Sequence, residues 1–287
     1  FYFISYIFKI INQVLIMPGS EKAINEFKKK RMGSFNWSGF RTLYEKEVRR
    51  YCKVFGQTVG APVITTLMFM MIFTLALGGN DRYIGDIPYS VFLAPGLIIM
   101  SILQNSFANT ASSIIGSKMQ GNIVDILLAP LGAKEISLAY ALGGITRGVM
   151  VGFFVLISMS IMTDLSFTHI WAILYFSVSG AMMLSLLGIM TGIWGQRFDQ
   201  TSAISNFVIM PLSFLSGTFY SIERLSGIWY NISQVNPFFY LIDGFRYGFT
   251  GRAEADPMIG VCYILAINIV LWISCYKMFK SGYKLRA

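Results

Sequence analysis

The residues able to do chemistry are few, and they are not grouped in catalytic patterns. The sequence Gly116–Lys118 lacks the GxxxxGK[ST] spacing of a phosphate-binding loop. Cys52, Cys262 and Cys275 form no CxxC pair and have no histidine at ligand spacing, so we expect three free thiols and no metal site. The single histidine, His169, is expected in a solvated loop. Since paired carboxylates and Ser-His-Asp sets are also missing, we expect no catalysis by this chain.

Arg147 is the exception, because it is an ionised side chain well inside an apolar segment. It lies about 11 residues into Ile136–Met162, roughly 16 Å from the near end of a helix. Burying an arginine there costs about 2.5–3.5 kcal/mol on insertion scales. One interpretation is a charge that faces a transport pathway or a partner helix. The other is a side chain that reaches toward the cytoplasm past Gly143, Gly144 and Gly148, and the sequence favours neither.

The composition indicates an all-α membrane protein around this arginine. The chain has 287 residues, of which 55% are apolar and 13% charged, and its mean hydropathy is +0.59. Soluble domains carry about 25% charged residues. Windows of about 20 apolar residues can cross a hydrocarbon core roughly 30 Å thick. Six transmembrane helices are predicted, near Val54–Leu77, Tyr89–Ile115, Ile136–Met162, Ile170–Trp194, Ser202–Tyr220 (bent by Pro211) and Met258–Phe279.

Residues 1–36 are expected to form an N-terminal tail. Phe1–Ile16 is apolar but short for a span, and no small-residue cleavage site of a signal peptide follows it. One interpretation is an interfacial segment. The one we favour is translated sequence upstream of a native start at Met17. The basic run Lys22–Arg31 is interpreted as a cytoplasmic anchor beside the membrane rather than a nucleic-acid patch.

Residues 37–53 are predicted to form an amphipathic helix in the membrane interface. Aromatic side chains recur every three or four residues on one face, and charged side chains, mostly basic, occupy the other. These two faces include Trp37, Phe40, Tyr44, Arg49 and Arg50. Residues 54–279 would then form the six-span domain, and residues 280–287 a cytoplasmic tail.

A polar loop, Gly116–Glu135, separates the second and third predicted spans and contains a short apolar run. The run stops at Ala129-Pro130, because proline cannot continue a helix and restricts the residue before it. A short helix outside the bilayer is predicted, and such a helix has little to do unless a soluble protein docks on it. Its residues are Asn122, Ile123, Val124, Asp125, Ile126, Leu127 and Leu128.

The segment Ile222–Gly251 is apolar and aromatic but is broken at Asn236-Pro237. Each half has roughly a dozen residues and would reach only about 18 Å as a helix, so neither can cross the bilayer. We therefore expect an outward re-entrant or interfacial helical hairpin. Its candidate functional residues are Asn236, Pro237, Asp243 and Arg246.

The net charge of +9 follows from sidedness rather than from a nucleic-acid partner. Most of the 23 lysines and arginines fall in the segment before the first span, in the Gly116–Glu135 loop and in the C-terminal tail. Six spans place all of these on one side, and the positive-inside rule makes that side cytoplasmic. Both termini are therefore predicted to be cytoplasmic.

Several short motifs, in this order and sidedness, resemble type-2 ABC transporter permeases. The resemblance covers about Trp37 to Arg286 and is closest to small bacterial permeases similar to nodulation lipo-oligosaccharide exporters. Phe1–Ile16 departs from that pattern. The motifs are Ala94-Pro95-Gly96, the LLAP of Leu127–Pro130, the GGITRG of Gly143–Gly148 and the outward NPFFYLIDGFRY of Asn236–Tyr247.

The resemblance implies a half-transporter in the bacterial inner membrane that exports an amphipathic substrate, either a lipid-linked saccharide or a drug-like molecule. Two chains would form a homodimer, and a separate ABC ATPase subunit would hold ATP and Mg, with no cofactor in this chain. ATPase closure would reach the spans through a coupling helix, Asn122–Leu128, with Trp37–Lys53 as a second contact and the hairpin helping to close the exit. Membrane lipid would be the other partner.

The competing class is a channel or secondary transporter that works without ATP. It predicts polar residues lining the spans or inverted repeats, and neither is clear in the sequence. A membrane-embedded enzyme would need a catalytic constellation, which the chain lacks. Co-purification of a separate ATPase separates these classes.

Overall fold

The computed structural model of the chain describes residues 35–76, 83–222, 225 and 227–285. The expectations for Phe1–Ile16, for a start at Met17 and for the basic run Lys22–Arg31 lie outside these residues. The chain divides into two units, residues 1–36 and Trp37–Ala287, and the elements named below belong to the second. The described residues of this unit are mostly helical and contain one antiparallel strand pair, β1 (Tyr83–Ile84) and β2 (Ile87–Pro88).

Five helices in the described part of the chain are long and apolar enough to cross a membrane. Their bounds agree with the predicted spans to within a few residues, because glycine, proline and polar turns interrupt the apolar runs at these places. The largest difference is in α5, which continues past the predicted end at Ile115 into the polar loop. The five are α4 (Phe55–Ala76), α5 (Tyr89–Met119), α7 (Ala133–Met162), α8 (Ile170–Trp194) and α13 (Pro257–Ser281).

The predicted span Ser202–Tyr220 is not a single helix. It consists of α9 (Phe198–Ile204), a π-helical turn η2 (Ser205–Ile209) and α10 (Met210–Leu215). Proline has no N–H with which to continue the α-helical bonding pattern. Next to Pro211, the N–H of Met210 bonds to the carbonyl of Ser205, five residues back, which widens the turn. None of the three pieces alone is long enough to be counted as a span.

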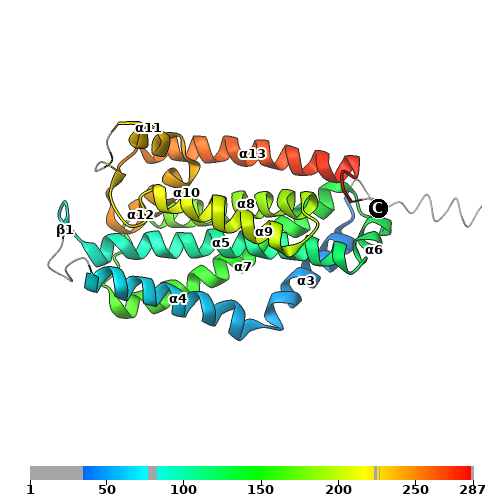
Figure 1. Ribbon diagram of the computed structural model, residues 1–287, viewed down its shortest axis with the longest axis horizontal. Coiled ribbons are helices and arrows are strands. Elements are labelled where there is room, and N and C mark those ends of the chain that lie inside the picture. The colour runs from blue at the N-terminus through cyan, green and yellow to red at the C-terminus, as the bar shows by residue number, and fades with distance from the viewer. Residues whose placement is uncertain (1–34, 77–82, 223–224, 226, 286–287) are drawn as a thin grey trace, which may run out of the picture. The chain divides into compact units, whose positions relative to one another are not determined.

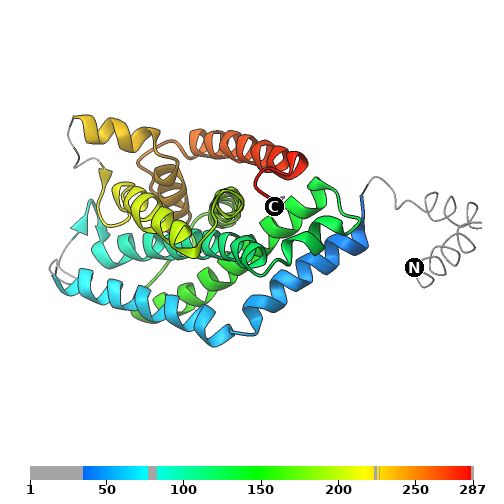
Figure 2. The same cartoon turned by 45° about the vertical axis from the view of Figure 1, so that its right-hand side comes forward.

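Helix α5 is the central element of the bundle (Figures 1 and 2). It packs most extensively against α8 and α7, and also against α4 and α12 (Pro237–Thr250). Glycine on the partner helix makes the closest approach possible, as small residues do between membrane helices. A Cβ atom at Gly188 of α8 would lie 2.6 Å from the carbonyl oxygen of Phe107 of α5.

The two ends of the bundle carry different elements (Figure 1). At one end, α3 (Trp37–Cys52) and α6 (Ile123–Leu128) share an apolar cluster with the last turns of α13. This cluster includes Leu43, Ile123, Ile126 and Phe279. At the other end lie β1, β2 and α11 (Ile228–Val235). Helix α3 and the C-terminal turns of α13 therefore lie at the same end of the bundle.

The expected hairpin has unequal halves. Helix α11 has 8 residues and α12 has 14, where about a dozen each was predicted. Of the two helices, only α11 leaves large apolar side chains exposed, namely Ile228, Trp229, Tyr230, Ile232 and Val235. Helix α12 is a core element instead, because most of its side chains are buried against α5, α8 and α13. Entry of this pair into the outer leaflet stays a prediction.

Candidate coupling helix and intramembrane pocket

Helix α6 follows α5 after a sharp turn. Gly121 has a φ of +76°, a left-handed conformation that glycine adopts without strain, and its N–H bonds to the carbonyl of Lys118 at 3.1 Å. Asn122 precedes the helix but does not cap it, since its amide bonds to the Gln120 side chain at 3.1 Å. Pro130 follows the last turn. The sequence prediction of a short helix before Ala129-Pro130 is confirmed.

The residues of α6 divide into two faces, which the sequence did not separate. Ile123 and Ile126 are only 5% and 8% exposed, because they pack into the apolar cluster shared with α3 and α13. Val124 and Leu128 are 48% and 79% exposed, and Asp125 is exposed beside them. Leu127 is half-buried. The surface offered to another protein is therefore the face of Val124, Asp125 and Leu128.

Helix α3 also differs from a simple interfacial helix, because it packs against α7 and forms side-chain hydrogen bonds to α5. Its buried side chains are Leu43, Glu47 and Tyr51, spaced four residues apart on one face. Trp37 is exposed, while Phe40 and Tyr44 are half-buried and stacked, with ring centroids 6.5 Å apart. Arg49 is exposed and pairs with Glu45 at 3.4 Å. Arg50 was assigned to the same face, but it reaches α5 instead.

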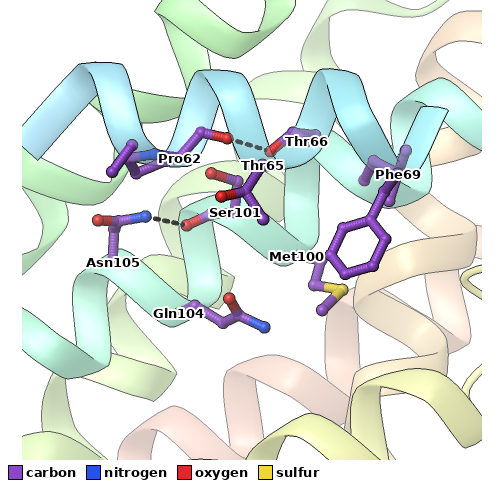
Figure 3. Close-up of a pocket in the computed structure, with 10 residues that line it drawn as sticks. Pro62, Thr65, Thr66, Phe69, Met100, Ser101, Gln104 and Asn105 are labelled. Carbon is purple, nitrogen blue, oxygen red and sulfur yellow. Dashed lines mark hydrogen bonds between the residues drawn. The ribbon is translucent and has the colours of Figure 1, made fainter. Parts of the chain in front are cut away.

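A pocket of about 230 Å³ lies between α4 and α5 (Figure 3). Two of its polar groups bond within their own helices: Thr66 donates to the carbonyl of Pro62 at 2.6 Å, and Asn105 to that of Ser101 at 3.0 Å. The hydroxyl of Ser101 and the amide nitrogen of Gln104 are buried and have no partner within the described ranges. The lining residues are Ala61, Pro62, Thr65, Thr66, Phe69, Leu97, Met100, Ser101, Gln104 and Asn105.

The lining of this pocket is chemically simple. Half of it is aliphatic or aromatic, and the other half consists of neutral hydroxyl and amide groups. Buried hydroxyl and amide groups without partners lose a hydrogen bond that water would supply, so they favour a ligand that can bond to them. The pocket can therefore accept a neutral, hydrogen-bonding group next to an apolar one.

Arg147 contacts α5 beside this pocket. Its guanidinium donates to the side-chain oxygen of Asn105 at 3.4 Å, and Asn105 also lines the pocket. Its Nε atom is buried, with no hydrogen-bond partner in the part of the chain that the structure describes. The structure therefore places the guanidinium against α5, and a role of Arg147 in a transport pathway stays a prediction.

Asn236 and Pro237 begin α12 at the other end of the bundle. The Asn236 side chain accepts the N–H of Phe238 at 3.1 Å, which is the bond of an N-cap, and Pro237 occupies the first helical position. The Asn236 amide also donates to the carbonyl of Leu212 at 3.0 Å and to the hydroxyl of Ser216 at 2.6 Å. These bonds fasten α12 to the end of α10.

Asp243 and Arg246 are buried and connect α12 to the loop that follows it, to α5 and to the turn after α10. Asp243 accepts the backbone N–H groups of Glu254 and Ala255, at 3.0 and 2.9 Å. Arg246 donates to the carbonyls of Phe92 and Gly217, at 3.2 and 2.6 Å. Burial raises the pKa of Glu254 in the loop after α12, although the nearby Arg246 opposes the shift. The contacts of both candidate residues are thus structural.

Two charged residues with structural roles were missed in the sequence. Lys118 was placed in the loop, but it lies in the last turn of α5 and donates to the carbonyls of Ile193 and Gly195 at 2.7 and 2.6 Å. It thereby binds the C-terminal end of α8. Glu47 is fully buried, and its spacing from two apolar neighbours could have shown that it shares their face. The contact of the half-buried Lys118 with α8 carried no such signal.

Together, the long apolar helices, the exposed short helix between two of them and the intramembrane pocket define a multi-pass membrane protein with features of a transport subunit. Comparison with known proteins agrees. Residues 38–250 match the ABC-2 type transporter family. The chain is 34% identical over 253 residues to the inner membrane transport permease YadH of Escherichia coli K12, covering 88% of this chain and 98% of that protein. The YadH proteins of Escherichia coli O157:H7 and Shigella flexneri match equally well.

This chain therefore belongs to the ABC-2 type transporter family and is a multi-pass inner membrane permease. The type-2 ABC permease predicted from the sequence motifs is confirmed. The residues that the structure describes contain no group of three His, Cys, Asp or Glu side chains close enough to hold a metal ion. The three cysteines are free thiols, with Cys52 and Cys262 exposed and Cys275 buried.

Proposed function

We propose that this chain is the permease subunit of an ATP-driven exporter that moves an amphipathic substrate outward across the inner membrane. Two copies form a homodimer, and a separate ABC ATPase subunit supplies ATP and Mg. The observation that carries the proposal is the exposed apolar face of α6. In an ABC-2 permease without a phosphate-binding loop, that face is suited to receive a soluble ATPase.

The proposed topology has six crossings with both ends cytoplasmic. If only the five long helices crossed, α3 and the end of α13 would lie on opposite sides. They share one apolar cluster at one end of the bundle, so the path α9–η2–α10 supplies the remaining crossing. The positive-inside rule assigns the α6 end, which holds Lys118, Arg197 and the basic residues of α3, to the cytoplasm. The face with α11 is then the outer one.

Force from the ATPase would reach the bundle through α5. Helix α6 is joined to α5 by the turn at Gly121, and α5 packs against three other long apolar helices, α4, α7 and α8, and against α12. Lys118 binds the end of α8, which leads directly into α9. A displacement of α6 is therefore applied both to the central helix and to the connection between α8 and the interrupted fifth segment.

The pocket between α4 and α5 supports a neutral, amphipathic substrate. Its polar groups are hydroxyls and amides, and its other walls are apolar. At about 230 Å³ it is smaller than typical ligand pockets of about 300–1,000 Å³, so it would hold one group of a larger substrate. A sugar unit on a lipid and a hydroxyl or amide group of a drug-like molecule both meet this description.

The test is capture of an ATPase by variants of α6. Val124→Asp/Leu128→Asp places two charges on the exposed face, so ATPase capture should fall at least tenfold while membrane insertion is unchanged. Tyr83→Asp in β1 is the control for each single replacement, Val124→Asp or Leu128→Asp, because it adds one carboxylate to an exposed site at the opposite end. Ile126→Asp is unsuitable, since Ile126 is buried and the change would disrupt the packing of α6 itself.

Two results would contradict the proposal. Unchanged capture by the double variant would show that α6 is not the contact. Failure of the native chain to capture any ATPase, combined with transport that continues without ATP, would support the alternative of a channel or secondary transporter.

A further inference from the structure

An ion pair within α3, between the half-buried Arg50 and the buried Glu47, connects this helix to α5. The carboxylate of Glu47 is fully buried, although the other acidic residue of α3, Glu45, is solvent-accessible. One oxygen accepts the hydroxyl of Ser113 at 2.7 Å, and the other accepts the Arg50 guanidinium at 3.3 Å. A carboxylate without such partners would cost several kcal/mol to bury. Docking of α3 therefore depends on groups that α5 supplies.

Arg50 makes the second half of this connection. Its Nη2 atom donates to both the backbone and the side-chain oxygen of Asn109, each at 2.7 Å. Its Nη1 atom donates to the hydroxyl of Ser112 at 3.3 Å. The ion pair is thus bound to α5 at three neighbouring residues, so α3 cannot slide or rotate on α5 without breaking charged hydrogen bonds.

Helix α7 closes the site from the other side. A Cβ atom at Gly143 would lie 2.8 Å from the Cβ of Glu47, so glycine provides the room that the glutamate occupies. One turn further along α3, the Tyr51 hydroxyl donates to Thr146 of α7 at 3.2 Å. Helix α3 is therefore seated between α5 and α7 in a single register.

The residues of α5 that receive α3 continue toward the pocket. Asn109 lies about one helical turn after Asn105, and Ser112 and Ser113 lie about two turns after it, so the four residues occupy one face of the helix. Asn105 lines the pocket and accepts Arg147, and it lies only about 6 Å along the helix from Asn109. The same polar face of α5 therefore binds α3 at Asn109 and lines the pocket at Asn105, one helical turn away.

We propose that Glu47 and Arg50 are positioning residues that link movement of α3 to the pocket between α4 and α5. The proposal rests on the function proposed above, because it assigns α3 a share of the ATP-driven movement. An ion pair with a buried carboxylate is weak evidence for stability but can specify one arrangement over others. Here the arrangement specified is the register of α3 on α5.

The experiment measures the pocket directly in the complete complex with its ATPase. Gln104→Cys is introduced into a chain without the three native cysteines, and its rate of reaction with a membrane-permeant maleimide is measured with and without ATP and vanadate. We expect nucleotide trapping to change this rate at least threefold in the parent. In Glu47→Gln/Arg50→Gln, the change should fall below 1.5-fold while ATPase capture is retained.

The matched control uses the exposed ion pair of the same helix. Arg41 and Glu45 are 2.7 Å apart on the exposed face, so Glu45→Gln/Arg41→Gln removes the same charges without touching α5. This variant should respond like the parent. Ser113→Ala removes a single bond to Glu47 and leaves both charges, so it should reduce the nucleotide-dependent change about twofold. If the Glu47/Arg50 double variant does not insert into the membrane, the Ser113→Ala variant tests the positioning role instead.

The outcomes separate the two proposals. If the parent responds to nucleotide and the Glu47/Arg50 and Ser113 variants respond equally, the positioning role is wrong and the proposed function stands. If the parent captures no ATPase and its pocket does not respond, the proposed function has failed. A parallel loss in the Arg41/Glu45 control would also overturn the positioning role, because charge alone would then explain the effect.

Discussion

The close contact of α5 with α8 makes a quantitative prediction for Gly188→Ala. The added Cβ would clash with the Thr110 hydroxyl, and it would lie 2.6 Å from the carbonyl oxygen of Phe107 and 3.3 Å from the backbone nitrogen of Ala111. A carbon and a carbonyl oxygen normally stay about 3.3–3.6 Å apart, so α8 must retreat by about 0.7–1 Å. A gap of that size forfeits a quarter to a half of the dispersion energy of each affected contact. Overpacking of this kind costs about 1–3 kcal/mol.

A buried thiol provides the assay. Cys275 is fully buried in α13 and bonds to the carbonyl of Leu186 in α8 at 3.3 Å, so it becomes reactive when these helices separate. In a chain with Cys52 and Cys262 replaced, a thiol-reactive dye should report one thermal transition in detergent. About 2–4 °C per kcal/mol gives a fall in Tm of about 2–12 °C for Gly188→Ala.

The control is Gly60→Ala in α4, where a Cβ would have no neighbour within 4 Å. Its effect should stay within about 0.5 kcal/mol. Equal melting of the Gly188 variant and its parent would refute the packing argument. So would an equal fall in both variants, since that would point to a general effect of alanine in these helices.

Three further predictions concern other sites. Lys118→Met removes the donor for the carbonyls at the end of α8. The same dye assay should therefore show a Tm lowered by about 2–4 °C, which corresponds to about 1 kcal/mol. An unchanged Tm would mean that water replaces the ammonium group. Burial raises the pKa of Glu254, so its stabilising contribution is present at low pH and is lost as pH rises through the folded-state pKa. The Tm of Glu254→Gln should therefore be higher than that of its parent at pH 7 and equal to it at pH 4. A difference in Tm that grows as the pH is lowered would contradict this prediction. A single cysteine at Leu128 should react with an impermeant maleimide only from the cytoplasmic side, and a single cysteine at Trp229 only from outside. The reverse pattern would show that the proposed topology is inverted.

The long helices were predictable because their signal is local. Each apolar run ends at glycine, proline or a polar turn, and α8 begins and ends at the residues predicted. The short helix α6 was predictable for the same reason, since Pro130 stops it. The burial of α12 was not predictable, because the length argument says that a helix of 14 residues cannot cross but not whether it packs inside the protein.

The candidate site was only partly predictable because its polar contacts are distant in sequence. The four-residue spacing of Glu47 from Leu43 and Tyr51 indicates the face that it shares. Its burial also depends on Ser113 and Gly143, which are distant in sequence. Likewise, the run Ile123–Leu128 is uniformly apolar apart from Asp125, so which side chains face the protein depends on α3 and α13. The pocket next to Arg147 could not be located because its two walls come from different helices.

The buried glutamate also has a consequence for how the protein is made. The ribosome synthesises α3 before any of the helices that receive it, and chains emerge N-terminal first. Glu47 therefore stays hydrated until Ser113, 66 residues later in the chain, and then Gly143, 96 residues later, have been translated and inserted. Docking of α3 is thus a late step of biogenesis, and it reports that α5 and α7 are already in place. A truncation that ends before α7 would leave α3 at the water-exposed surface, within reach of proteases that survey unfinished membrane proteins.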